Sequence, residues 1–135
     1  MARGKGGRAG VEVEGGPQLR RAFRRMGGRA EDLSRAHRKG ADIVARRARD
    51  LAPRVTGALA DSIRVQARTT GAAVVAGGTT LVPYAGPIHF GWRDRNIEPR
   101  PFLYDAAADE RAEVAHVYEA EIALLVRRFD AEAPD

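Results

Sequence analysis

The sequence predicts an α+β domain, in which a long N-terminal helix and a C-terminal helix pack on a small antiparallel sheet. Apolar residues recur every three or four positions over residues 18–50 and again over residues 103–129, which is the spacing of one helix face. Between these stretches, two short segments flank Thr69-Thr70-Gly71 in a pattern typical of a hairpin. The order helix, strands, helix favours helices packed on one sheet.

The length bounds the domain organisation. A chain of 135 residues is enough for one domain with its own core, and folding at this size hides roughly two-thirds of the unfolded surface. We expect a disordered basic tail over residues 1–10, which are rich in Gly and have little to bury. A single α+β domain is expected over residues 11–130, followed by a frayed C-terminal tail over residues 131–135.

The composition excludes several classes of site. The chain has no Cys, which rules out a disulfide framework and a thiolate metal site and fits an intracellular origin. No apolar run approaches the roughly 18 residues that a membrane span needs. The N-terminus also lacks the apolar stretch of a signal peptide. We therefore expect no membrane partner.

The N-terminal elements follow from local pattern. Residues 11–14 alternate apolar and polar side chains, which permits a short edge strand before the break at Gly15-Gly16-Pro17. The helix over residues 18–50 contains Gly27-Gly28, and each Gly costs about 1 kcal/mol relative to Ala. We therefore expect a kink or a break there. Pro53 ends the helix, because it lacks an N–H and its ring clashes with the preceding turn.

The middle of the chain is expected to hold the sheet. Thr56 is predicted to cap a short helical turn over residues 57–62. Residues 63–68 alternate and predict one strand, and residues 72–76 predict its hairpin partner. Residues 81–90 are predicted to be a third extended segment, at an edge or on an irregular path, because prolines interrupt it.

The C-terminal stretch predicts a single helix over residues 103–129. A polar loop over residues 91–100 precedes it, and Pro99 and Pro101 hold the end of that loop extended. The predicted buried face consists of Leu103, Ala107, Val114, Val117, Tyr118, Ile122, Leu125 and Phe129. The predicted solvent face consists mostly of Arg111, Glu113, Glu119, Glu121, Arg127 and Arg128.

Charge is divided unevenly along the chain. Residues 1–60 carry 15 Lys and Arg against 6 Asp and Glu, a net charge of +9, and residues 61–135 carry 8 against 12, a net charge of −4. The basic half could face nucleic acid, or the two halves could meet across copies of the chain, or the first helix could simply be solvated. The candidate DNA-facing or inter-subunit residues are Arg20, Arg21, Arg24, Arg25, Arg29, Arg35, Arg38 and Lys39.

No catalytic, cofactor-binding or metal site is expected. The three histidines, His37, His89 and His116, lack the paired spacing of metal ligands. Ser34 and Ser62 lack the sequence context of a nucleophile, and the glycine pairs match no phosphate-binding loop. His89 is the one candidate for acid–base chemistry, and the spacing supplies no partner for it. We therefore predict that the protein is not an enzyme and needs no cofactor.

Three segments combine prolines or glycines with apolar side chains and are expected to form fixed corners. The first contains Ala52-Pro53 and Thr56-Gly57-Ala58-Leu59-Ala60-Asp61-Ser62-Ile63, the second Tyr84-Ala85 and Phe90-Gly91, and the third Pro101-Phe102-Leu103. A short Val-rich start and a long basic helix precede them. In this order, over about residues 11–125, the chain resembles the tail-completion or head–tail joining (neck) family of long-tailed bacteriophages.

The resemblance implies a structural virion protein of the neck or tail end, which completes the tail and joins it to the DNA-filled head. It implies a ring, six-fold by expectation, with neighbouring neck and tail-tube proteins and genomic DNA as further contacts. The expected location is the virion neck or tail, after assembly in the host cytoplasm. The charge distribution keeps an alternative open: a non-specific DNA-binding protein that uses the Arg-rich N-terminal helix.

Two positions depart from the family pattern. Relatives usually carry Asp before Thr-Gly, where this chain has Val55. Relatives often carry Glu-Phe-Gly-Thr, where this chain has His89-Phe90-Gly91-Trp92. An imidazole and an indole thus replace a carboxylate and a hydroxyl, so the contacts of those groups do not carry over. Trp92 would instead anchor its own loop.

Overall fold

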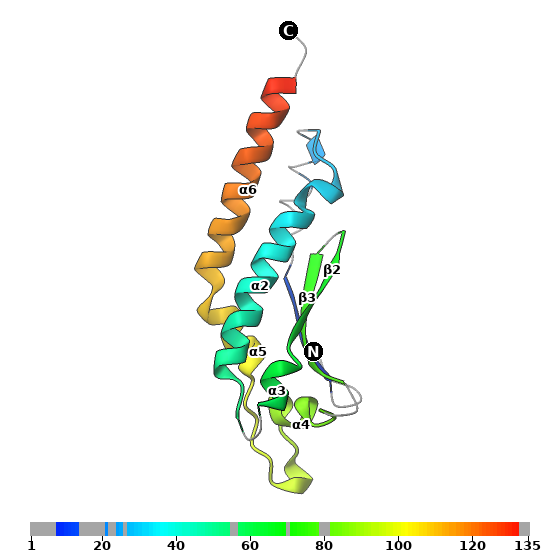
Figure 1. The fold of residues 1–135 in the computed structure, drawn as a ribbon, viewed down its shortest axis with the longest axis vertical. Coiled ribbons are helices and arrows are strands. Elements are labelled where there is room, and N and C mark those ends of the chain that lie inside the picture. The colour runs from blue at the N-terminus through cyan, green and yellow to red at the C-terminus, as the bar shows by residue number, and fades with distance from the viewer. Residues whose placement is uncertain are drawn as a thin grey trace.

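The structure is a computed structural model that describes residues 8–13, 21, 24–25, 27–54, 57–69, 71–78 and 82–132. Its long elements form three layers (Figure 1). Helix α2 (Ser34–Leu51) lies between helix α6 (Arg111–Glu132) and a three-stranded antiparallel sheet. This arrangement confirms the predicted α+β class.

The sheet consists of β1 (Arg8–Val13), β2 (Arg64–Arg68) and β3 (Gly71–Gly77), in the order β1-β3-β2. The predicted hairpin is confirmed by the antiparallel pairing of β2 with β3. The prediction that the tail extends to residue 10 is wrong, because β1 begins at Arg8 and pairs with β3 along its whole length. Backbone pairing does not require large side chains, and the small side chain of Ala9 is buried in the main core.

The register separates two faces of the sheet. The inner sheet face, toward α2, carries Ala9, Ala72, Val74 and Ala76, which share one core with Ala41, Val44, Ala45 and Ala48 of α2. Because side chains alternate along a strand, the intervening residues lie on the other face. We call it the outer sheet face; it carries Arg8, Gly10, Arg64, Gln66, Arg68, Ala73 and Val75.

The predicted break in the first helix is confirmed. Residues 21, 24 and 25 are helical, Gly27 has a φ of +90°, and a 3₁₀ turn, η1 (Ala30–Leu33), leads into α2. A positive φ is strained for residues with a Cβ, so Gly27 permits the change of direction. At its other end α2 stops two residues before Pro53, as expected.

The turn after Pro53 contains a short helix, α3 (Ala58–Asp61). Its N-cap is Gly57, with a φ of +83°, rather than the predicted Thr56, which lies outside the described residues. A glycine fits this position because the backbone there is left-handed.

The prediction of a third extended segment over residues 81–90 is wrong. Residues 85–90 form a helix, α4 (Ala85–Phe90), in which Pro87 is the third residue. The N–H groups of the first helical turn have no intrahelical acceptor, so a proline is tolerated there. Pro87, one of the prolines that argued for an irregular strand, is therefore part of the first turn of a helix, while Pro83 lies in the turn before it.

The prediction of one C-terminal helix is also wrong, because two helices occupy this stretch. Helix α5 (Phe102–Asp109) ends at Glu110, and α6 follows it. On the predicted buried face, Leu103, Tyr118 and Leu125 are buried, and Ala107, Val114, Val117 and Ile122 are half-buried. The side chain of Phe129 lies outside the described residues.

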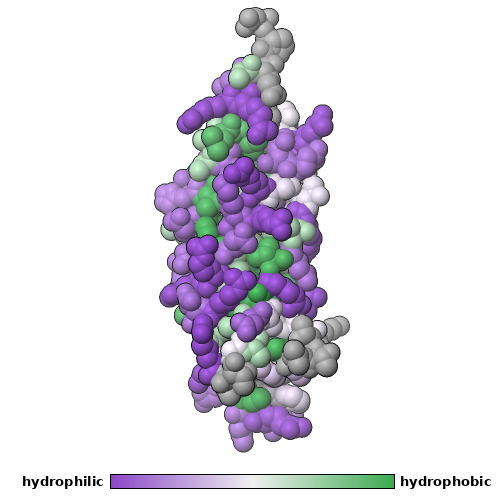
Figure 2. Space-filling view, viewed as in Figure 1, coloured by the Kyte–Doolittle hydropathy of each residue, from purple (hydrophilic) through white to green (hydrophobic). Residues whose placement is uncertain are grey.

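Polar contacts join α6 to α2. The ring of His37 is buried and hydrogen-bonds the hydroxyl of Tyr118. Glu121, predicted to face solvent, is 8 % exposed, because its Oε1 accepts a hydrogen bond from Lys39 Nζ at 2.5 Å and lies 3.6 Å from Arg35 Nε. Figure 2 shows the face over these two helices, which is largely hydrophilic with hydrophobic patches between the charged side chains.

Phe102→Ala is expected to lower the free energy of unfolding by about 3–5 kcal/mol, because the side chain is 2 % exposed and truncation leaves a cavity in the main core. Urea denaturation followed by circular dichroism measures the change. Leu124→Ala is the matched control, since Leu124 is 53 % exposed and its truncation should change little. A Phe102 variant as stable as the control would contradict the packing described here.

Candidate functional site

The three corner segments meet at one end of the molecule, beyond the end of α2 (Figure 1). Leu59 and Ile63 of the first segment, Ala85 of the second and Phe102 of the third belong to one buried cluster. We call this region the corner end. The structure therefore brings together residues that are up to about 50 positions apart in the sequence, and it does so by packing rather than by a shared ligand.

Ser62 ties the first corner to the sheet. Its Oγ donates to the carbonyl oxygen of Leu59 at 2.6 Å and accepts from the N–H of Gly77 at 2.9 Å. Arg64 Nη1 donates to the carbonyl oxygens of both Ser62 and Gly77, each at 2.9 Å. Each such bond contributes about 1 kcal/mol. Together they fix the angle between α3 and the end of β3.

Gly91, in the second corner, is in close contact with Pro99, which lies just before the third corner. Its φ is +80°, and a Cβ on it would lie 2.9 Å from Cδ of Pro99, so no other residue fits without a shift of the backbone. The end of the loop that contains Arg100 is fixed to α4, because the N–H of Arg100 donates to the carbonyl oxygen of Ile88 at 2.9 Å. The loop between α4 and α5 is thus locked against α4.

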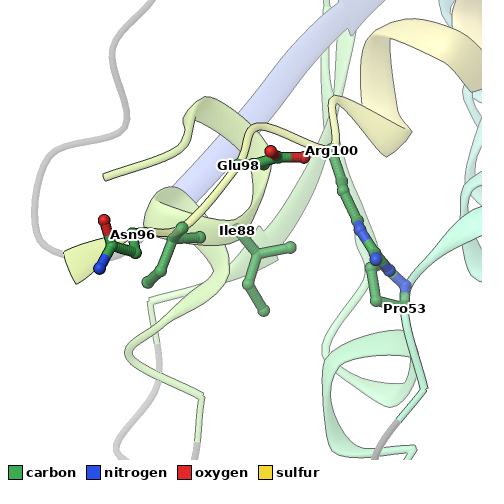
Figure 3. A pocket seen from close by; sticks show the side chains of 6 residues that line it. Pro53, Ile88, Asn96, Glu98 and Arg100 are labelled. Atoms are coloured by element: carbon green, nitrogen blue, oxygen red, sulfur yellow. The ribbon is translucent and has the colours of Figure 1, made fainter. Parts of the chain in front are cut away.

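A cleft of about 340 Å³ lies where these corners join (Figure 3). It is lined by Pro53, Ile88, Asn96, Ile97, Glu98 and Arg100. In Figure 3 the side chain of Arg100 extends toward Pro53, with Ile88 between Pro53 and the loop. Among the described residues, the lining holds no nucleophilic side chain, and the two charged residues of the lining are exposed.

His89, the sole acid–base candidate, lies inside the corner end. It is 1 % exposed, and the rings of Phe90, Phe102 and Tyr104 meet it edge-on at centroid distances of 4.5, 5.3 and 4.5 Å. Among the described residues, neither ring nitrogen has a hydrogen-bond partner. Burial lowers the pKa of His89 below its ordinary value, and the charge of Asp105 opposes this. The environment thus favours a neutral, enclosed imidazole.

Three aromatic residues at the corner end remain at the surface. Tyr84 is 36 % exposed, Tyr104 is 38 % exposed and Trp92 is 45 % exposed. The backbone of Trp92 forms a two-bond bridge with Ile97, at 2.9 and 3.0 Å, and Arg95 lies 5.3 Å from the indole centroid. The backbone at Trp92 therefore closes its loop, while the indole keeps a solvent-facing surface.

The predicted basic residues that the structure describes do not all lie in one patch. Arg20 lies outside the described residues, and Arg21, Arg24, Arg25 and Arg38 are exposed. Arg29 lies 3.9 Å from Glu31, while Arg35 and Lys39 face Glu121 of α6. Three further arginines, Arg8, Arg64 and Arg68, share the outer sheet face. Arg64 and Arg68 are four residues apart and therefore lie on the same face of β2, and this spacing is the signal that the sequence analysis missed.

In the part of the chain that the structure describes, no cluster of His, Asp and Glu is arranged to hold a metal ion. Nor does any helix there have the length and apolarity to cross a membrane.

Residues 18–91 match the model of a family described as "Bacteriophage HK97-gp10, putative tail-component". The chain belongs to this HK97-gp10-like family. The match covers more than half of the chain and includes the first two corner segments, whereas the third corner lies beyond it. The HK97-gp10-like family is one of phage tail components, so the resemblance found from the corner motifs is confirmed at that level. Comparison with curated proteins and with solved structures gave no match.

The buried state of His89 predicts a pH-dependent stability. Because the folded protein holds the pKa of His89 below that of the unfolded chain, the unfolded chain binds more protons in mild acid. Stability is therefore complete above the ordinary pKa and is lost as the pH falls through the folded one. We expect the free energy of unfolding to fall by up to about 1.4 kcal/mol per pH unit below about pH 6.5.

Denaturation at a series of pH values measures this slope. His89→Leu should remove most of it, while His116→Gln serves as the control, because His116 is exposed on α6. An unchanged slope in the His89 variant would mean that other groups govern the acid response.

Proposed function

We propose that this HK97-gp10-like protein is a structural component of the head–tail connector or tail end, which completes the tail and joins it to the DNA-filled head. In this proposal it acts as part of a ring, six-fold by expectation, in which each interface buries roughly 800 Å² per partner. Its partners are copies of itself and the neighbouring neck and tail-tube proteins. It is located in the virion after assembly in the host cytoplasm.

The observation that carries the proposal is the interlocked corner end. A subunit of a closed ring must hold a fixed angle between its two contact surfaces, because small errors add up around the ring. The bonds of Ser62 and the close approach of Gly91 to Pro99 restrict the joints between helix, sheet and loop. Such stiffness supports a building block of defined shape.

The geometry also supports a role without catalysis. A general acid or base must lie within hydrogen-bond reach of the reacting group. His89 is enclosed by aromatic rings, and no nucleophile is found among the described residues that line the cleft. We infer that the distinctive residues of this chain maintain its shape.

A phage that lacks the gene tests the proposal. We expect heads and tails that fail to join stably, and electron microscopy of the lysate measures the fraction of joined particles. The wild-type gene supplied in trans should restore joining, and so should Thr69→Ala, which alters an exposed residue of the hairpin turn. Gly91→Ala should not restore it, because its Cβ would meet Pro99. Normal infectious particles without the protein would rule the proposal out.

A second candidate function is non-specific DNA binding by the Arg-rich N-terminal region. The exposure of Arg21, Arg24, Arg25 and Arg38 favours it, whereas the engagement of Arg35 and Lys39 by Glu121 weakens it. Binding through phosphates should weaken steeply with rising salt. A gel-shift titration of duplex DNA over a range of salt concentrations measures this, and no shift at low salt would eliminate the candidate.

A further inference from the structure

We propose that the indole of Trp92 and the cleft beside it form one docking surface for a virion protein other than this chain. The inference rests on the proposed function and names the contact by which the subunit would join the next component along the tail axis. We call the residues Pro53, Ile88, Trp92, Ile97 and Arg100 the docking surface. The partner segment that fits it carries an apolar side chain with a carboxylate beside it.

Trp92 is the only tryptophan in the chain and is 45 % exposed. Contact between a large apolar ring and water is unfavourable, and burial of the ring at an interface removes that contact. Trp, Tyr and Arg are also the residues that most often carry the binding energy of protein interfaces. Single apolar side chains are common on protein surfaces, so the proposal depends on what surrounds Trp92.

The indole adjoins the cleft. The backbones of Trp92 and Ile97 exchange two hydrogen bonds as an antiparallel pair, so their side chains lie on the same side of the loop with Cβ atoms about 5 Å apart. Ile97 lines the cleft of about 340 Å³ together with Ile88 and Pro53. The apolar surface therefore extends from the indole through Ile97 into the cleft.

The surface is formed before any partner binds. Asn96 has a φ of +54°, a left-handed conformation that Asn adopts more readily than most residues, and this turn places Trp92 opposite Ile97. The guanidinium of Arg95 lies over the indole, 5.3 Å from the ring centroid, and restricts its rotation. A surface that is already ordered loses less entropy on binding, which increases affinity.

The charges around the docking surface favour a protein partner over DNA. The loop over residues 91–100 carries three basic and two acidic residues, all exposed: Arg93, Arg95, Arg100, Asp94 and Glu98. Such a nearly balanced set attracts a polyanion only weakly, because the carboxylates repel phosphate. A single arginine at the edge of an apolar cleft, by contrast, is complementary to a carboxylate next to an apolar side chain.

The position of the docking surface favours a different chain over a second copy of this one. The loop with its 3₁₀ turn, η2 (Arg93–Arg95), lies at one end of the long axis of the molecule, opposite the C-terminal end of α6 (Figure 1). Helices α2 and α6 and the sheet run along that axis. In a ring of copies placed side by side, these long elements would contact one another, and the end of the molecule would face the component stacked on the ring.

Selective fluorescence of position 92 tests the contact, because no other tryptophan is present in the chain. The full-length protein is expressed with 5-hydroxytryptophan, which is excited at wavelengths that ordinary tryptophan does not absorb. It is then mixed with tails purified from the gene-deleted phage and, separately, with heads from the same lysate. Binding to one of them should protect the ring from quenching by iodide.

The affinity for the same particles, measured by co-sedimentation, gives a second readout. Trp92→Ala should lower it by about 30-fold, which is the effect of a central interface residue. Leu124→Ala is the matched control, since Leu124 is 53 % exposed on α6, and it should leave the affinity unchanged. Circular dichroism verifies that both variants fold.

Charge reversal tests the expected carboxylate of the partner. Arg100→Glu should lower the affinity for the same particles by about tenfold. Arg46→Glu is its control, because Arg46 is exposed on α2 and not on the docking surface, and it should bind normally. An Arg100→Glu variant that binds as tightly as the control would overturn the charge match and with it the stated chemistry of the partner.

The outcomes separate this inference from the proposed function. Binding to tails or heads with position 92 still open to iodide, or with Trp92→Ala at full affinity, would overturn the inference and leave the function intact. Binding to neither particle would overturn both. Protection that requires only a higher concentration of the protein itself would assign the surface to a second copy, and protection by duplex DNA alone would assign it to DNA; either result would overturn the inference.

Discussion

The close packing of α2 against two layers at once is the constraint on which the fold depends. Toward the sheet, α2 presents Ala41, Ala45 and Ala48, whose small side chains let the helix lie close to Val74 and its neighbours. Toward α6 the contact is partly polar, through His37 and through the carboxylate of Glu121. A buried carboxylate that meets two cations adds little net stability, but it disfavours any other register between α2 and α6. The sheet and α6 are thus held on opposite sides of one helix.

Periodic segments of the sequence were sufficient to predict the long elements. The stripe of α2, its end before Pro53, the break at Gly27 and the hairpin all appear in the structure. The failures occurred where the local signal has two meanings. Gly86-Pro87 interrupts a strand but also suits the first turn of a helix, which is what forms. Glu110, between α5 and α6, is neither Gly nor Pro, so nothing in its own identity marks the break.

The sequence was enough to predict which segments form the candidate site, but not that these segments lie together in the structure. The corner motifs are recognisable by their prolines and glycines, yet their convergence depends on contacts between distant segments, such as the bond from Gly77 to Ser62. For the basic residues, closeness in the sequence was misleading. Sequence proximity grouped Arg35 and Lys39 with the other arginines, but Glu121, 82 positions after Lys39, draws them to α6. The arginines of the outer sheet face become a group only through strand pairing.

The position of His89 shows how this chain packs an ionisable residue in its interior. A carboxylate in an aromatic enclosure would need a cation or several N–H donors, because an unpaired buried charge is strongly unfavourable. A neutral imidazole needs far less, and the edges of Phe90, Phe102 and Tyr104 enclose it. The lowered pKa of His89 is the expected consequence of that enclosure. The corner end of this chain is therefore stabilised by aromatic packing around an uncharged ring. Salt should have little effect on its stability, whereas acid should lower it.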